Sequence, residues 1–461
     1  MYKHVAFAVV AVLAAAGSCQ AQSWEQFIDN GAVYTTNLAP GHGLSLDGAG
    51  GIFVQTLDTH PISGTDFSHL YAFAGDGSHA YPWSLVGRPW GASDPAFVSR
   101  AFHSNAGYRV AWYEVGALNP FDYIVLFDPQ SPAPVQQLTL PRQNGIAVLG
   151  VASDGQGGLL VLRSGNAGTL PTLLRVSYPF GSGQVLWEQP VADCNPGTVA
   201  VQPDDIDFAF DAQNPAASAI HILGHCSAGI AGVSNEFLQS FDLDGGLRQQ
   251  RRFNPSLANF PLLARHKVGG GAWLYEYAPE TGGDSHLLQI ADAQHGLYPL
   301  FWPDIHGAVA VDQGQPALIR AASAASPAHY FVADLQRSPG GLFEIGDTRL
   351  YKGLSAYAAN GMRWSSDGQG NRVAAYRSSL AGSLNLAGYG QDTEPKWLRS
   401  LDAVGAAAQP QLGHEVASGE FVLAVDRSQN GHSGVYVTQF AALDSGACLP
   451  PFACPVGPDL P

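Results

Sequence analysis

Charged side chains are scarce in this 461-residue chain, where Lys, Arg, Asp and Glu make up 13% of the residues against 46% apolar ones. A disordered chain combines low hydrophobicity with high charge, so this composition excludes one. Basic residues number only 22 against 38 acidic ones, which gives a net charge of −16. Nucleic-acid and anionic membrane surfaces are bound by clustered basic residues, so we expect neither as a partner.

Long apolar runs are missing after the first twenty residues, so we predict no membrane span in the mature chain. Residues 1–21 are typical of a secretory signal peptide: Lys3 precedes an apolar run, and small Cys19 and Ala21 stand at the −3 and −1 positions of a cleavage site. We therefore predict a secreted or periplasmic protein. The alternative is a lipoprotein, because residues 16–19 resemble a degraded lipobox whose lipid would be carried by Cys19.

Cysteine is also rare, and four remain once the leader is removed: Cys194, Cys226, Cys448 and Cys454. An even number in an oxidising compartment predicts two disulfides. The favoured pairing among three is the local one, Cys194–Cys226 and Cys448–Cys454. No C-x2-C spacing is present, which disfavours a zinc site.

Enzyme motifs are missing as well. The chain contains no G-x-S-x-G, H-E-x-x-H or Walker A sequence, and no G-x-G-x-x-G that opens a helix. Its Asp-Gly-x-Gly turns carry too few carboxylates for calcium loops. We therefore expect a binding role rather than catalysis, and we assign no catalytic residue.

A repeat is present throughout the middle of the chain. An apolar strand ends in a Gly-rich turn and a second apolar strand follows, as in residues 44–54, 151–162 and 362–375. The turns at Asp47, Asp154 and Asp367 have the Asp-Gly-x-Gly pattern, which is typical of hairpins. Each unit ends in a strand with Trp or Leu, as in residues 183–189 and 395–401.

The repeat divides the chain into units of about 50 residues, the period of a four-stranded propeller blade. The predicted units are 44–92, 93–143, 144–195, 196–257, 258–304, 305–350, 351–401 and 402–446. We predict an all-β fold, a single β-propeller over residues 22–446 with eight blades, seven being the alternative. The last unit lacks its Trp-bearing strand, so residues 24–36 should complete it and close the ring. Residues 447–461 form a Pro-rich tail stapled by a disulfide.

These turns and the final W-x-x-x-L strand resemble bacterial secreted propellers of the PQQ-like and related repeat families. The resemblance implies a fold and does not by itself imply a bound quinone. Quinoprotein dehydrogenases in that family carry a disulfide between adjacent cysteines under the quinone, and no two cysteines are adjacent here, which argues against PQQ. Members that act as outer-membrane assembly scaffolds are lipoproteins.

Candidate site residues lie in the segments that enter the innermost strands. Three histidines there, His42, His306 and His414, are candidate ligands for a divalent metal or acid/base groups. Candidate ligand-binding residues are the carboxylates Asp204, Asp205 and Asp207 and the rim aromatics Trp90, Trp302 and Tyr351, which would suit stacking on sugars. The plainer interpretation is a polar channel mouth that binds nothing.

A second cluster contains His221, His225 and Cys226. In a strand the two histidines share one face and the cysteine has the other, so the three cannot chelate one metal together. We expect a surface pair of histidines beside a disulfide.

Three functions remain open. The first is an exported monomer that binds a protein or glycan through one face of the ring. The second is a polysaccharide lyase or hydrolase with its site at the mouth of the channel. The third is a lipid-anchored scaffold for envelope assembly. Fold alone does not decide among them.

Overall fold

The structure is a computed structural model, and every element in its described part is a β-strand. It describes residues 24–29, 34–39, 43–46, 50–62, 66–75, 77–83, 101–102, 110–114, 121–127, 134–141, 148–154, 158–165, 170–177, 185–191, 200–209, 217–227, 234–255, 260–277, 287–301, 310–311, 317–321, 329–352, 362–367, 369–377, 383–405, 409–415, 418–441 and 452–453. Within these ranges no helix has the length and hydropathy needed to cross a membrane.

The strands of the described residues form eight sheets, numbered here along the chain. Sheet 1 contains β2 (Thr35–Leu38), β3 (Leu44–Leu46), β4 (Ile52–Thr59), β5 (Asp66–Phe73) and β6 (His79–Trp83). Sheet 2 contains β7 (Ala101–Phe102), β8 (Val110–Glu114), β9 (Phe121–Phe127) and β10 (Pro134–Pro141). Sheet 3 contains β11 (Val148–Ser153), β12 (Gly158–Arg163), β13 (Thr172–Ser177) and β14 (Val185–Pro190). Sheet 4 contains β15 (Ala200–Ala209), β16 (Ala219–Ser227), β17 (Ser234–Phe241) and β18 (Leu247–Phe253).

The second half continues the same order. Sheet 5 contains β19 (Leu262–Gly269), β20 (Ala272–Tyr277), β21 (Leu287–Asp292) and β22 (Gly296–Leu300). Sheet 6 contains β23 (Ala310–Val311), β24 (Ala317–Ala321), β25 (His329–Arg337) and β26 (Phe343–Lys352). Sheet 7 contains β27 (Arg363–Ser366), β28 (Arg372–Arg377), β29 (Ser383–Tyr389), β30 (Pro395–Asp402) and β34 (Phe452–Ala453). Sheet 8 contains β31 (Gln411–Glu415), β32 (Glu420–Gln429), β33 (His432–Phe440) and β1 (Glu25–Ile28).

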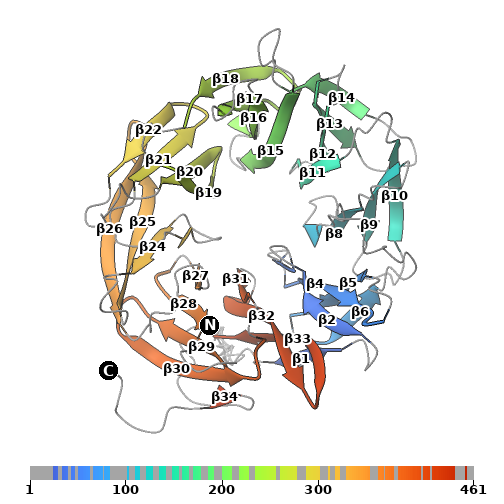
Figure 1. Cartoon of the computed structure of the whole chain (residues 1–461), viewed down its shortest axis with the longest axis vertical. Coiled ribbons are helices and arrows are strands. Elements are labelled where there is room, and N and C mark those ends of the chain that lie inside the picture. Colours follow the sequence, from blue (N-terminus) through green and yellow to red (C-terminus); the bar gives the residue numbers. More distant parts are fainter. Residues whose placement is uncertain are drawn as a thin grey trace, which may run out of the picture.

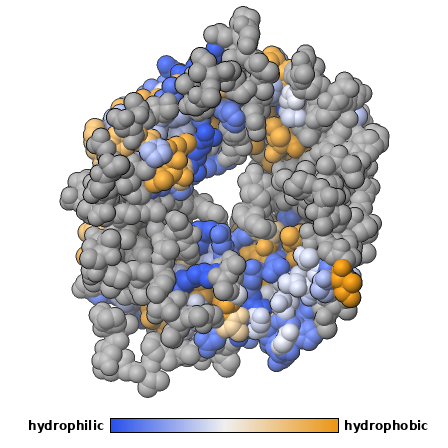
Figure 2. Space-filling view, viewed as in Figure 1, coloured by the Kyte–Doolittle hydropathy of each residue, from blue (hydrophilic) through white to orange (hydrophobic). Residues whose placement is uncertain are grey.

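The sheets are antiparallel and surround a central opening, with β11, β15, β19, β27 and β31 toward the opening and β10, β14, β18, β22, β26 and β30 toward the outside (Figure 1). Figure 2 shows the same opening, bordered in part by hydrophilic side chains. Four-stranded sheets set radially around an opening are the architecture of a β-propeller. The strands of each sheet fall inside one predicted unit or overrun it by at most two residues, apart from β2 of sheet 1, β34 of sheet 7 and β1 of sheet 8. Sheet 1 begins before its unit, at Thr35. It does so because two short strands, β2 and β3, both pair with β4.

The Asp-Gly-x-Gly turns connect the first two strands of a sheet, as the hairpin prediction requires. The buried carboxylate of Asp154 accepts a hydrogen bond from the Gly158 N–H at 2.7 Å and one from Arg175 Nε at 2.8 Å. Asp367 likewise accepts the Asn371 N–H at 3.0 Å. Each turn therefore uses its carboxylate to satisfy its own backbone. Asp47 lies outside the described residues.

The core lies between successive sheets rather than inside any one of them. Leu160 and Ile206 belong to one apolar cluster that joins sheets 3 and 4, and Leu223 and Tyr275 belong to the next, which joins sheets 4 and 5. The middle strands are buried on both faces, so β20 has all six of its residues buried. A sheet of this kind cannot exclude water from its two faces alone, and neighbouring sheets must stack on it.

Sheet 8 is completed by the N-terminal strand. β1 pairs antiparallel with β33, so Glu25 stands opposite Thr438 and Ile28 opposite Val435. Hydrogen bonds then cross from sheet 8 to sheet 1, and we call this boundary the seam. The Gln411 side chain accepts from Leu44 N at 2.8 Å and donates to the Ala39 carbonyl at 2.9 Å.

Asp426 is a partly buried carboxylate at the seam, and it accepts the Leu38 N–H. Burial raises the pKa of Asp426 above its ordinary value, while the bond from Leu38 opposes that rise. A carboxyl with a higher pKa in the folded chain than in the unfolded chain lowers stability once ionised, and the penalty fades as pH falls toward the unfolded value.

We therefore expect Asp426→Asn, which keeps an oxygen for Leu38 N, to be more stable than the wild type at pH 7, with a smaller advantage at pH 4. Urea unfolding of both proteins at the two pH values measures this. The same advantage at both values would show that folding leaves the acidity of this carboxyl unchanged.

At the other end of the chain, β34 adds to the outer edge of sheet 7, with Ser400 opposite Ala453 and Leu401 opposite Phe452. Cys226 is buried on β16 and is disulfide-bonded. Cys19, Cys194, Cys448 and Cys454 lie outside the described residues, as do the leader 1–21 and most of the tail 447–461. The disulfide pairing, the cleavage site and the staple therefore stay predictions.

Candidate functional site

Four of the predicted site residues lie outside the described part of the chain: His42, Trp90, Trp302 and His306. His414 is half-buried near the end of β31, with its ring 5.2 Å from that of Phe421. Among the described residues no three His, Cys, Asp or Glu side chains gather into a metal-binding group. The histidine metal site therefore stays a prediction.

The predicted carboxylates lie within a strand rather than in a loop. Asp204, Asp205 and Asp207 belong to β15, where a bulge falls between Pro203 and Asp205. After the bulge, Asp205 stands opposite Leu223 and Asp207 opposite His221. The register therefore brings Asp207 to the same level of sheet 4 as His221.

The prediction that Tyr351 is a rim aromatic is wrong. Its side chain is 1% exposed, and its ring makes edge contacts with Trp364 at 4.9 Å and Tyr389 at 5.0 Å. Both partners belong to sheet 7, whereas Tyr351 is the next-to-last residue of β26 in sheet 6. The aromatic ring is therefore part of the core between two sheets and cannot stack on a ligand.

The prediction of a surface histidine pair is also wrong for His221, which is 7% exposed, while His225 is half-buried. The cause is Gly271, at the turn between β19 and β20 of sheet 5. Its φ is +78°, and a Cβ there would lie 2.6 Å from the His221 ring. A glycine is required because the turn backbone passes directly over the imidazole.

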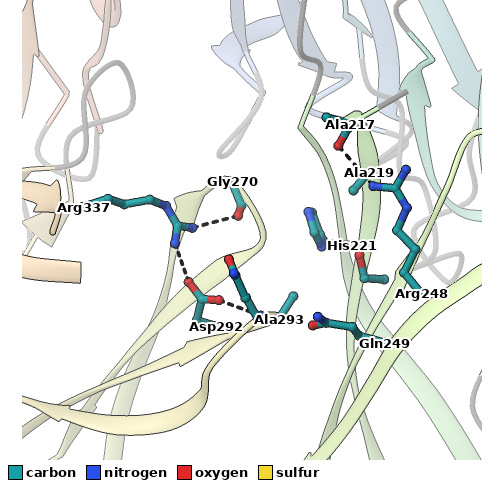
Figure 3. A pocket seen from close by; sticks show the side chains of 11 residues that line it. Ala217, Ala219, His221, Arg248, Gln249, Gly270, Asp292, Ala293 and Arg337 are labelled. Atoms are coloured by element: carbon teal, nitrogen blue, oxygen red, sulfur yellow. Dashed lines mark hydrogen bonds and ion pairs between the residues drawn. The ribbon is translucent and has the colours of Figure 1, made fainter. Parts of the chain in front are cut away.

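The His221 ring forms one wall of a pocket of about 240 Å³ between sheets 4 and 5 (Figure 3). The pocket is lined by Ala217, Ala219, His221, Ser240, Arg248, Gln249, Gly270, Asp292, Ala293, Gln294 and Arg337. It lies where the first strand of sheet 5 ends, at Gly269. Of the predicted site residues, Asp207 also lies toward the end of an inner strand, β15.

One side of the pocket is held by an ion pair between sheets 5 and 6. Arg337 Nη1 donates to the buried Asp292 carboxylate at 2.8 Å, and Nη2 donates to the Gly270 carbonyl at 3.1 Å (Figure 3). The guanidinium also lies 4.1 Å from the centre of the Phe343 ring. Asp292 in turn accepts the Gln294 N–H at 2.7 Å. These contacts hold the glycine turn and the wall beneath it in one arrangement.

The other side is formed by a row of polar residues across sheet 4. His221, Ser240 and Gln249 are successive partners on β16, β17 and β18, so they share one face. A register shift follows between Ser240 and Phe241, which stands opposite Leu247, and the neighbouring Arg248 Nη1 donates to the Ala217 carbonyl at 3.1 Å. Figure 3 shows His221 between Arg248 and the Arg337–Asp292 pair.

The pocket offers guanidinium, amide and hydroxyl groups beside carbonyl and carboxylate oxygens, and the apolar side chains among its described lining residues are alanines. Such a lining can hold a small polar group by hydrogen bonds, and its volume lies just below the range of about 300–1,000 Å³ typical of ligand pockets. Two signals in the sequence pointed to it: the run from Arg248 to Arg252 with three arginines, and the glycines 269–271.

No protein-family model matches the chain, and no curated protein matches its sequence. Solved structures similar to it include the β-propeller domain of the Trilobed protease from Pyrococcus furiosus, at 8% identity over 89% of this chain and 97% of that one, with a TM-score of 0.41. The Dos1 propeller shares 11% identity over 91% of this chain and 94% of its own, with a TM-score of 0.43. Puromycin hydrolase shares 12% identity over 84% of this chain, which spans only 58% of that protein, with a TM-score of 0.44. These likenesses concern the fold alone, and the fold they share is the β-propeller.

Proposed function

We propose that this chain is an exported, monomeric propeller of eight blades that binds a glycan or protein partner at the pocket between sheets 4 and 5. Eight described sheets follow one another along the chain, and apolar clusters join sheet 8 both to sheet 7 and to sheet 1. The pairing of β1 with β33 supports closure of the ring by the N-terminal strand. We also propose that the leader directs export, that the chain forms two disulfides, and that it works without a cofactor.

The observation that carries the binding role is the pocket itself. Its lining comes from three sheets, and the Arg337–Asp292 pair and the Gly270 turn fix its shape before any ligand arrives. A site that is already ordered spends little conformational entropy on binding. Donors such as Gln249 and Arg248 lie on the strand nearest the outside, where a large partner can reach them.

The test is a substitution that fills the pocket with a large side chain. Ala217 lies at its mouth and is exposed, so Ala217→Trp should occupy the site at little cost in stability. We expect this variant to lose the saturation-transfer NMR signals that a panel of oligosaccharides and an envelope protein extract give with the wild type. The matched control is Leu186→Trp, on the outer strand of sheet 3 at 49% exposure, which should bind normally. Equal binding by all three proteins would contradict the proposal.

The alternative of a hydrolase is favoured by one observation, the order of Asp207, His221 and Ser240 across three paired strands. Serine hydrolases combine these three residue types, although in a geometry that must also provide an oxyanion site. The same panel distinguishes the two functions. New reducing ends or cleaved peptides that disappear in Ser240→Ala would favour hydrolysis, and intact ligands favour binding. A lipid on Cys19, found by intact mass, would favour the envelope scaffold.

A further inference from the structure

Positive charge is concentrated beside the pocket in a protein that is otherwise acidic. The chain has 22 basic residues in 461, yet Arg248, Arg251 and Arg252 fall within five positions of β18. All three are exposed. A local field of opposite sign to the net charge of −16 attracts anions to this part of sheet 4.

Arg251 and Arg252 are adjacent on β18, so their side chains lie on opposite faces of that strand. Arg251 stands opposite Leu238, which packs toward sheet 5, and Arg251 Nη2 donates to the carbonyl of the lining residue Gln294 at 3.0 Å. Arg252 stands opposite Phe237, which packs toward sheet 3. Arg251 therefore borders the pocket, while Arg252 points away from it.

The acid already in the pocket does not cancel this charge. Asp292 is the one carboxylate among the described lining residues, and Arg337 pairs with it at 2.8 Å. No carboxylate of the described residues pairs with Arg251, whose planar guanidinium can bind a carboxylate through two parallel hydrogen bonds.

The rest of the lining favours a sugar over a peptide as the bearer of that anion. Peptide anchors fill pockets with large apolar or aromatic surfaces, but here the apolar lining is alanine. The Gln249 amide, the Ser240 hydroxyl and the Gly270 carbonyl instead offer the mixed donors and acceptors that ring hydroxyls need.

We infer that the pocket binds an acidic sugar residue of a glycan, with its carboxylate held by Arg251 and Arg248 and its hydroxyls by the polar row on sheet 4. This inference rests on the proposed binding function and names its ligand class. Binding of this kind weakens with salt because the charges at the mouth are exposed.

The test is isothermal titration with a galacturonate trimer, the same trimer with its carboxyls reduced, and a sulfated neutral trimer. We expect the wild type to bind the galacturonate trimer and to bind the reduced trimer about tenfold more weakly. Arg251→Gln should weaken galacturonate binding about tenfold as well. The matched control is Arg252→Gln, which removes the same net charge from the next position and should change the affinity less than about twofold.

Each contrary outcome has a distinct meaning. Equal affinity for the charged and reduced trimers, both lost in Ala217→Trp, would leave the binding function standing and overturn the acidic-sugar inference. Equal losses in Arg251→Gln and Arg252→Gln would overturn it by showing a general charge effect. Binding of the sulfated trimer alone, of a tetraglutamate peptide alone, or of none of these probes would also overturn it.

Discussion

Replacing Ile28 by Asp is expected to lower the free energy of unfolding by at least about 4 kcal/mol. This is the largest loss of stability that we expect from a single substitution in the strands at the seam. Ile28 is the last residue of β1 and is 4% exposed. It packs in the apolar cluster between sheet 8 and sheet 1, with Val422 and Val437 among its members. An aspartate there removes the apolar contacts and places an unpaired charge in the seam.

The measurement is urea unfolding followed by circular dichroism and tryptophan fluorescence. Trp24 reports on the seam because its ring lies 5.6 Å from Phe73 and its Nε1 donates to Gln439 Oε1 at 2.6 Å. The control is Ile62→Asp, the same substitution at a position that is 91% exposed, which should change stability by less than about 0.5 kcal/mol. Similar unfolding midpoints for the two variants would show that β1 does not stabilise the seam.

Truncating Tyr275 to Ala is expected to cost about 3–5 kcal/mol, because it opens a cavity and removes a hydrogen bond between two sheets. Tyr275 lies on β20 of sheet 5 with no exposed surface, and its hydroxyl donates to Glu236 Oε2 of sheet 4 at 2.8 Å. Arg265 donates to the other oxygen of the same buried carboxylate. Burial, together with the neighbouring Glu236, raises the pKa of Tyr275, so its hydroxyl stays protonated and able to donate.

Tyr275→Phe separates the two effects. It keeps the ring and removes only the donor to a charged acceptor, for an expected loss of about 1.5–3 kcal/mol. The control is Tyr277→Phe, whose hydroxyl donates to the neutral Gln289 Oε1 at 2.9 Å within sheet 5, with an expected loss of about 0.5–1.5 kcal/mol. Thermal unfolding ranks the three variants. If Tyr275→Phe were as stable as the wild type, Glu236 would not depend on Tyr275 to bridge sheets 4 and 5.

The strands and their order could be predicted because their causes are local. Asp154 and Asp367 close hairpins with their own carboxylates, and alternating apolar residues on either side make the two strands. The missing outer strand of the last unit could also be recognised, because a sheet of three strands leaves an edge open. From the second unit on, the same reasoning put the unit boundaries between successive sheets or within two residues of the end of a sheet's last strand.

The site could not be predicted, because its parts come together only across sheets. Sequence reasoning recognised that His221 shares a strand face with His225, but what covers that face is Gly271 of the next sheet. The repeat places Tyr351 in a loop that feeds an inner strand, which predicts a rim position, yet Trp364 and Tyr389 of sheet 7 enclose it.

The sequence by itself determined the all-β class, the repeat and the position of the hairpin turns, since each depends on residues close together in the chain. Only the tertiary structure decided which polar residues are buried, which arginines are paired and where a pocket opens. The physical reason is that strand alternation selects a face for each side chain, while the neighbouring sheet decides whether that face meets apolar core, an ion pair such as Arg337–Asp292, or water.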